Sequence, residues 1–452
     1  MNKYIQKSQK LMMTWVGVLC LAWLVAPASS EARLKIKLQD GIKFKQYKIA
    51  VPAFKAMGGS QQMAKKITAI LRNDLTLSGT FKVLDPSSYQ EKAEKSGIEP
   101  KTFDFEPWVK ISAEGLLKGS YTPKGSGYLV KFRFYELGSN KLAYKEDFTI
   151  PNKATLRWYL HLFADRLYKF LTKERGIFRT KIAYIRNYRG SQEVWMMDFD
   201  GGSPRKLTNN GSINALPAWS PNGRYIAYTS WKKRNPDLFI QDVRTGKSRK
   251  ISPFKGLNTG AAWSPDSQRI AFSASRGKSS MDIYVVNVSG GTPVRLTKAK
   301  WGIRNLSPTW SPDGKKISFV STRYGSPQIF VMDVNGNSAS NIQQLVTKGK
   351  YNQSPKWSPK GDWILFTGRD ERNVFDLFLV DPKTRKVKRL TQNQGNNTEA
   401  SWSPNGQNIV FSSTRDGVSK LFIMTKEGKY AKKLTYLSGK YLTPTWSPWL
   451  SK

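Results

Sequence analysis

The stretch Trp219-Ser-Pro-Asn-Gly223, followed by the alternating apolar run Tyr225-Ile-Ala-Tyr228, opens a unit that recurs to the end of the chain. Its tripeptide Trp-Ser-Pro occurs six times, at intervals of 44, 47, 47, 45 and 44 residues. The copies begin at Trp219, Trp263, Trp310, Trp357, Trp402 and Trp446. A period of this length is typical of a four-stranded β-propeller blade, so the repeat predicts an all-β propeller.

Turn residues separate the predicted strands within each unit. In the first unit, Asn222-Gly223 predicts a tight turn after the Trp strand. The run 225–228 and the segment 237–242 are the next two predicted strands, and a last strand ends at Ile251-Ser252. In other units this last strand ends in Leu-Thr, at Leu207, Leu296, Leu390 and Leu434. We interpret Trp-Ser-Pro as structural, with Trp packed between blades and Ser-Pro fixing a turn.

The two ends of region 177–452 each hold part of a blade. The segment 181–208 contains only three predicted strands and has no Trp-Ser-Pro strand in front of it. The C-terminal segment 441–449 supplies one remaining strand, with Trp446 at the corresponding position. We therefore predict six blades, with a ring closed by the N- and C-terminal strands, which removes exposed strand edges.

Residues 43–176 lack the repeat and predict a small α/β domain before the propeller. The segment 61–77 has the apolar spacing of an amphipathic helix, and a closing helix is predicted at 155–171. Predicted strands lie at 49–54, 81–84, 115–121, 128–135 and 142–148. Pro52 lacks an amide donor, so we expect the first of these strands at a sheet edge.

The first thirty residues predict a secretory signal peptide, residues 1–30. Lysines precede an uncharged apolar run at 11–26, and small residues follow it. Cleavage after Ser30 leaves Glu31 as the first mature residue, and cleavage after Ala32 is the second choice. A retained membrane anchor is the rival interpretation, but the run of about sixteen residues is short for a span of roughly twenty. Cys20, the only cysteine, would leave with the signal.

Charge is the unusual feature of the composition. The chain has 74 Lys and Arg against 32 Asp and Glu, a formal net charge of +42. Such an excess indicates anionic partners or an unusual solvent rather than a fold. The basic residues are scattered through every segment, which argues against a specific nucleic-acid site. Attraction to anionic envelope surfaces and adaptation to an acidic or otherwise unusual periplasm are the other two interpretations, and we favour a general surface character over any specific anion site.

Residues for catalysis or metal binding are scarce. His161 is the only histidine, and its place in a predicted helix favours a packing or hydrogen-bonding role. The turns at 198–201 and 312–314 contain Asp and Gly but lack the spacing of a calcium loop, so we interpret them as hairpin turns. No nucleophile elbow or phosphate loop is present. We therefore predict a protein without enzymatic activity, cofactor or metal.

Several segments together resemble one family, the TolB family. The C-terminal run 444–450, the loop 396–402 and the junction Gly176 to Tyr184 resemble its ending, one of its propeller loops and its entry into the first blade. Arg157, His161 and Asp165 fit a helix pattern placed just before that junction. The run Glu31-Ala-Arg33-Leu-Lys-Ile36 resembles the mature N-terminus. Each blade motif is generic to propellers, whereas their combination in this order is specific.

The resemblance implies a monomeric periplasmic component of the Tol–Pal system, acting in outer-membrane integrity and cell division, peripheral to membranes and without a nucleic-acid partner. It implies two binding sites. A Pal-like peptidoglycan-associated lipoprotein would bind at the propeller mouth, formed by the loops before the Trp-Ser-Pro strands. Matching loop by loop gives Leu257, Asn258, Gly260, Arg304, Asn305, Leu306, Asn352, Asn397 and Glu399. Leu257 and Leu306 depart from the polar residues expected there.

The second implied site is an N-terminal arm, residues 31–42, which would pair with a TolA-like inner-membrane protein. The expected contact residues are Glu31, Arg33, Leu34, Ile36 and Leu38. Apolar and basic residues alternate along the arm, which suits strand addition to a partner sheet. The same pattern also suits a strand of the chain's own α/β domain. The alternative function is an envelope scaffold whose propeller binds glycan or an anionic polymer.

Overall fold

A computed structural model describes residues 45–91, 96–275, 280–369 and 371–450 of the chain. The predicted signal peptide (1–30) and the predicted arm (31–42) lie outside these described residues. Within the described ranges, no helix is both long enough and apolar enough to cross a membrane.

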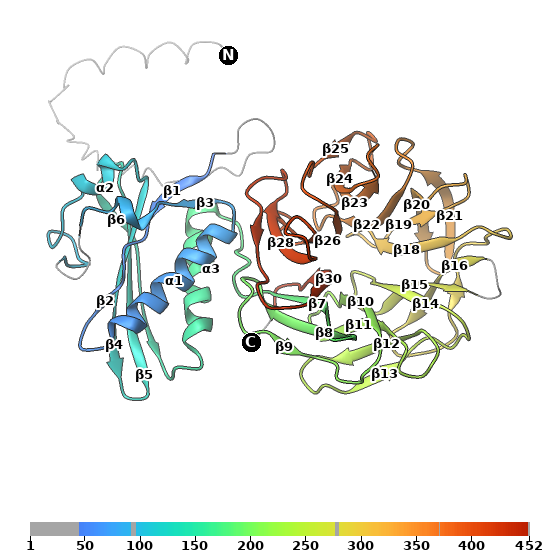
Figure 1. The fold of residues 1–452 in the computed structure, drawn as a ribbon, viewed down its shortest axis with the longest axis horizontal. Helices are drawn as coiled ribbons and strands as arrows, with labels where there is room; N and C mark the ends of the chain where they lie inside the picture. The colour runs from blue at the N-terminus through green and yellow to red at the C-terminus, as the bar shows by residue number, and fades with distance from the viewer. Residues whose placement is uncertain (1–44, 92–95, 276–279, 370, 451–452) are drawn as a thin grey trace, which may run out of the picture. The chain divides into compact units, whose positions relative to one another are not determined.

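The N-terminal region is an α/β structure in which helices pack against a mixed sheet. Its sheet has the order β3-β1-β4-β5-β6, with the short β2 beside β4. Helices α1 and α3 lie side by side (Figure 1). The elements are β1 (Tyr47–Ala50), β2 (Lys55–Ala56), α1 (Gln61–Leu77), β3 (Phe81–Val83), the 3-10 turn η1 (Pro86–Ser88), α2 (Glu106–Lys110), β4 (Gly115–Lys124), β5 (Gly127–Glu136), β6 (Lys141–Ile150) and α3 (Leu156–Thr172).

The two long helices lie where the sequence predicts them, whereas α2, η1 and β2 were not predicted. Ser60 caps α1 by accepting a hydrogen bond from the Gln62 amide, and Ile67, Leu71 and Leu75 form its buried face. The expected edge position of the strand 49–54 is wrong. β1 runs between β3 and β4 and is parallel to both. Pro52 is compatible with this interior position because β1 ends before it, at Ala50.

The rest of the chain forms six four-stranded antiparallel sheets arranged as propeller blades (Figure 1). Blade 1 consists of β30, β7, β8 and β9, and blades 2 to 6 are β10–β13, β14–β17, β18–β21, β22–β25 and β26–β29. The fold class predicted from the repeat is thereby confirmed. The strands are β7 (Lys181–Tyr188), β8 (Ser191–Asp198), β9 (Arg205–Lys206), β10 (Asn214–Trp219), β11 (Tyr225–Ser230), β12 (Asp237–Asp242), β13 (Ser248–Lys250), β14 (Asn258–Trp263), β15 (Arg269–Ser275), β16 (Met281–Asn287), β17 (Val294–Arg295), β18 (Asn305–Trp310), β19 (Lys316–Ser321), β20 (Gln328–Asn335), β21 (Ser338–Gln344), β22 (Asn352–Trp357), β23 (Ile364–Arg369), β24 (Phe375–Val380), β25 (Val387–Arg389), β26 (Asn397–Trp402), β27 (Asn408–Ser413), β28 (Lys420–Thr425), β29 (Lys432–Lys433) and β30 (Lys440–Trp446).

Blade 1 closes the ring as the sequence predicts. Strand β30 pairs antiparallel with β7, so that Leu442 lies opposite Ile185 and Trp446 lies opposite Ile182. Backbone bonds thus join the last strand of the chain to the first strand of the propeller.

The Trp-Ser-Pro residues have the packing roles that we predicted. Trp263 at the end of β14 packs among Ala227 and Ile240 of blade 2 and Ile270 of its own blade. The serine then fixes the turn: Ser220 Oγ accepts a hydrogen bond from the Tyr225 amide at 2.9 Å. Ser264, Ser311 and Ser403 accept the equivalent bond in their own blades.

Candidate functional site

The four asparagines predicted at the propeller mouth begin the inner strands of blades 3 to 6. Asn258, Asn305, Asn352 and Asn397 are at most 3% exposed. Asn305 Nδ2 donates to Asp282 Oδ1 of the preceding blade at 3.2 Å. Asn397 makes the equivalent contact with Asp376 at 3.1 Å. These amides join one blade to the next from inside the protein, so their side chains do not form an exposed contact surface.

The Leu-Thr ending of the outer strands belongs to the same buried network. Thr297 Oγ1 donates to Asp282 Oδ1 at 2.6 Å and accepts from the Ile283 amide at 3.0 Å. Arg295 pairs with the other oxygen of the same carboxylate. We call this arrangement of acid, hydroxyl and asparagine the blade staple. It recurs with Glu193, Thr208 and Asn214, and with Asp376, Thr391 and Asn397.

Two further predicted residues, Gly260 and Glu399, line a cavity of about 50 Å³ on the propeller axis. Each inner strand has a register shift at this point, and the residue there has a φ between +46° and +67°. These residues are Leu216, Gly260, Ser307, Ser354, Glu399 and Thr443. Only Gly260 adopts that conformation without strain, so five of the six bulges are held by the surrounding sheet.

The axial cavity contains one acid and one base. Glu399 Oε2 accepts from the Thr443 amide at 2.8 Å, and Lys356 lines the same cavity. Burial raises the pKa of Glu399 and lowers the pKa of Lys356. Each shift favours the neutral form of its group, whereas the attraction between the two groups opposes both shifts.

The face around the cavity, at the Asn end of the inner strands, exposes several large apolar side chains. We call it the mouth face. It consists of the loops before each inner strand and the loops between the second and third strands of each blade. Of the predicted residues, Arg304 is exposed there and Leu257 and Leu306 are half-buried. The exposed apolar residues are Tyr188, Ile213, Trp301, Tyr324, Val418, Tyr436 and Leu437.

Sequence reasoning missed these exposed side chains. Trp301, Tyr436 and Tyr324 are 87%, 76% and 70% exposed. Trp301 lies in the loop that joins β17 of blade 3 to β18 of blade 4, and Tyr324 lies in the loop between β19 and β20 of blade 4. The sequence did contain a signal for two of them. Trp301 and Tyr436 lie in loops between a Leu-Thr pair and the next inner strand, where an aromatic residue is expected to be exposed. Exposed aromatic groups gathered on one face mark protein-binding surfaces.

A second polar constellation lies along α3. Arg157, His161 and Asp165 are four residues apart and therefore share one helix face. Arg157 Nε donates to Asp198 Oδ2 of β8 at 2.9 Å, and Arg179 Nε donates to Asp165 Oδ2 at 2.7 Å. The face of α3 thus connects the N-terminal region to the first blade.

At the buried centre of this face of α3 lies a histidine–carboxylate pair. His161 Nδ1 lies 2.7 Å from Asp74 Oδ2 of α1, and both side chains are buried. Burial raises the pKa of Asp74 to about 6. Burial alone would lower the pKa of His161, but the Asp74 carboxylate outweighs it and the pKa is raised. The predicted hydrogen-bonding role of His161 agrees with this geometry.

Asp74, His161 and Asp200 also form a group of three potential metal ligands among the described residues. Asp200 already pairs with Arg157, and His161 Nδ1 faces Asp74. A permanent cation at Arg157 neutralises the carboxylate that a metal would need. We therefore treat the group as a structural ion-pair network.

Comparison with known proteins defines the class. Residues 34–143 match the TolB amino-terminal domain, and residues 168–375 and 370–451 match the TolB beta propeller domain. The Tol-Pal system protein TolB of Myxococcus xanthus is 40% identical over 428 residues, which cover 94% of this chain and 97% of that protein. A TolB protein of Anaeromyxobacter dehalogenans is 35% identical over 222 residues, 49% of this chain and 51% of the relative.

A solved structure has the same fold along nearly its whole length. The crystal structure of TolB from Acinetobacter baumannii superposes with a TM-score of 0.77 at 26% identity, covering 89% of this chain and 97% of that one. The chain is thus a β-propeller protein with an additional N-terminal α/β region. It belongs to the TolB family.

Proposed function

We propose that the chain is a non-catalytic periplasmic adaptor of a Tol–Pal envelope system. It would bind a Pal-like lipoprotein on the mouth face and a TolA-like inner-membrane protein through the arm 31–42. In this role it would support outer-membrane integrity and constriction at cell division. The similarity to Tol-Pal system proteins along 94% of the chain supports membership of the system.

The observation that carries the lipoprotein site is the exposed aromatic set on the mouth face. The loops that carry Trp301 and Tyr324 are joined by a hydrogen bond from the Arg304 amide to Thr322 Oγ1, and the exposed Arg304 lies three residues from Trp301. Tryptophan, tyrosine and arginine contribute most to binding energy in protein interfaces. The buried asparagines instead would hold these loops in place through the blade staples.

Titration of residues 31–452 with the Pal-like lipoprotein of the same organism, without its lipid, tests the site. We expect saturable one-to-one binding in a calorimeter at physiological salt. Trp301→Ala and Tyr324→Ala should each weaken it by about tenfold or more, because loss of an interface anchor costs about 1.4 kcal/mol or more. Tyr430→Ala, an exposed tyrosine in the turn between β28 and β29, is the matched control. No binding at low salt would refute the adaptor proposal.

A scaffold that binds an anionic polymer is the second candidate function, favoured by the net charge of +42. Polymer binding would weaken steeply as salt rises, because it releases counterions. It would also be insensitive to Trp301→Ala. The same calorimetric series at two salt concentrations therefore separates the two functions.

Deletion of residues 31–42 tests the proposed arm. We expect the shortened chain to lose binding to a TolA-like C-terminal domain and to keep its affinity for the Pal-like lipoprotein. Strand addition depends on backbone bonds, so a change of Leu34 alone should weaken the contact less than the deletion does. Unchanged TolA binding after the deletion would exclude the arm.

A further inference from the structure

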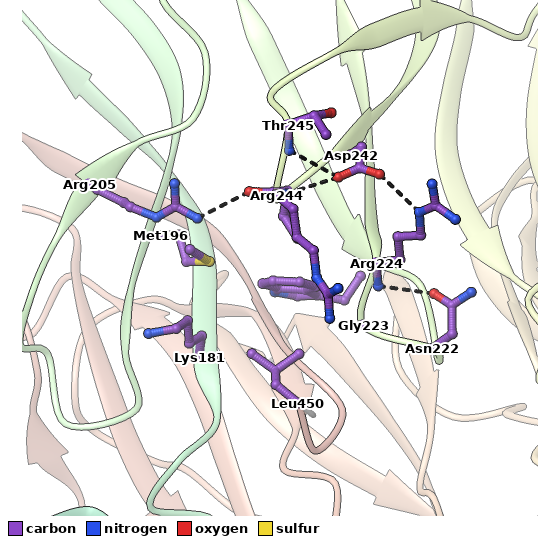
Figure 2. Close-up of a pocket in the computed structure, with 12 residues that line it drawn as sticks. Lys181, Met196, Arg205, Asn222, Gly223, Arg224, Asp242, Arg244, Thr245 and Leu450 are labelled. Carbon is purple, nitrogen blue, oxygen red and sulfur yellow. Dashed lines mark hydrogen bonds and ion pairs between the residues drawn. The ribbon is translucent and has the colours of Figure 1, made fainter. Parts of the chain in front are cut away.

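A cavity of about 740 Å³ lies between blades 1 and 2, at the Trp-Ser-Pro end of the inner strands and therefore opposite the mouth face. Four cationic side chains line it: Lys181, Arg205, Arg224 and Arg244. Figure 2 shows Arg205 and Lys181 on one side, Arg224 on the other and Arg244 between them. The size is within the usual range for small-molecule sites.

Two of the four cations are already paired. Lys181 Nζ lies 2.6 Å from Asp198 Oδ1, and Arg224 Nε lies 2.9 Å from Asp242 Oδ2. Arg205 donates to the Val243 carbonyl at 3.3 Å and pairs with no carboxylate in the described part of the chain. Among the described residues, Arg244 has no hydrogen bond or ion pair from its guanidinium group. Within residues 45–91, 96–275, 280–369 and 371–450, no carboxylate balances the charge of these two cations.

The repeat of the fold supplies an internal comparison. An equivalent cavity of about 400 Å³ lies between blades 4 and 5. Strand pairing aligns the two cavities: Arg205 lies opposite Met196, as Gln343 lies opposite Val331. Ile226 pairs with Trp219 as Ile364 pairs with Trp357, so Asp362 takes the place of Arg224 two residues earlier.

At the third position Lys383 takes the place of Arg244, so the second cavity keeps a cation there but has no arginine fork. The backbone amides of Arg244 and Lys383 each donate a hydrogen bond to an aspartate two residues earlier, which supports this correspondence. The propeller forms the second cavity without any of the three arginines. Their convergence in the first cavity is therefore not a requirement of the fold.

The floor of the cavity is apolar. Trp219, Met196 and Leu450 line it below the charged groups. Gly223 lies on the same floor with a φ of +70°, and a Cβ there would lie 2.6 Å from Leu450 Cδ2. A larger residue at 223 would displace Leu450, so the glycine keeps this floor intact.

We propose that this cavity binds a small, multiply charged oxyanion carried on a compact organic body. Arginine forks bind carboxylate and phosphate groups through paired hydrogen bonds, and two of the three have their charge unneutralised. The apolar floor receives the uncharged part of the ligand. The site is separate from the mouth face and does not depend on the proposed lipoprotein contact.

Calorimetric titration of residues 31–452 with citrate and with pyrophosphate tests the site. We expect one-to-one binding, weakened by about tenfold or more in R205Q/R244Q, because each charge-assisted bond to an arginine is stronger than a neutral one. R249Q is the matched control. Arg249 lies opposite Ile240 as Arg205 lies opposite Met196, and both arginines donate to a valine carbonyl of the next blade.

Two results would overturn the proposal: no heat of binding for either anion at low ionic strength, or an equal loss in R249Q and in R205Q/R244Q. The second would indicate diffuse attraction to a basic surface. Vesicles with phosphorylated lipid headgroups distinguish the source of the oxyanion. Binding to them that R205Q/R244Q abolishes places the anion on a membrane, and binding of the free anions alone indicates a soluble ligand.

Discussion

Replacing Trp446 with alanine is expected to lower the free energy of unfolding by about 3–5 kcal/mol, as truncation of a buried tryptophan usually does. Trp446 is 5% exposed, and its Nε1 donates to Thr180 Oγ1 at 2.8 Å. It also ends β30, the strand that closes the ring against β7. Loss of its side chain therefore weakens the closure as well as the packing between blades.

Urea denaturation followed by circular dichroism measures this effect. Trp301→Ala is the matched control, because the same chemical change at a side chain 87% exposed should alter stability by less than about 0.5 kcal/mol. A chain that ends at Gly439 lacks β30 altogether, and we expect it to lose the cooperative transition of the propeller. Equal stability of W446A and W301A would show that closure contributes little.

Replacing His161 with alanine is expected to cost about 3–5 kcal/mol at pH 7.5, because it leaves the buried Asp74 carboxylate without its partner. The pKa of Asp74 is raised to about 6, and Asp200 adds a like charge nearby. Near pH 5 the orphaned carboxyl can take up a proton, so the loss should be smaller there. At pH 7.5, the double variant D74N/H161A should lose less free energy of unfolding than the sum of the losses in D74N and H161A.

The wild-type protein should follow the same linkage. The folded-state pKa values of Asp74 and His161 are both raised, so the folded state holds their protons more tightly than the unfolded state does. The stabilisation that comes from protonating these two groups in the wild-type protein is greatest at low pH. It falls as pH rises from about 4 through 6 for Asp74, and continues to fall above 6.5 for His161. A cost of H161A that does not vary between pH 5 and 7.5 would contradict this account.

The architecture could be predicted from the sequence because the repeat is local and regular. The spacing of Trp-Ser-Pro predicts the blades, and the unpaired strand at 441–449 predicts the closure. The position of β1 could not be predicted, because Pro52 lies beside the strand and its actual end is set by pairing with β3 and β4.

The mouth residues show why side-chain roles are harder to predict than strands. Asn305 precedes an alternating run and looks like a loop residue, yet its partner Asp282 lies 23 positions away, in the preceding blade. The staple exists only once the blades are stacked. The residue type alone does not separate the exposed Trp301 from the buried tryptophans of the repeat. Only its position in a loop distinguishes it from them.

The bulges in the inner strands determine how the two faces of the propeller can communicate. The axial cavity of about 50 Å³ has room for only a few water molecules, and Lys356 and Glu399 both line it. Solutes are therefore not expected to travel along the axis. The inner strands run from the mouth face to the Trp-Ser-Pro turns, so each of them connects the two faces directly. A ligand bound in the cavity between blades 1 and 2 and a partner bound on the mouth face are therefore connected through the protein, not through a solute channel along the axis.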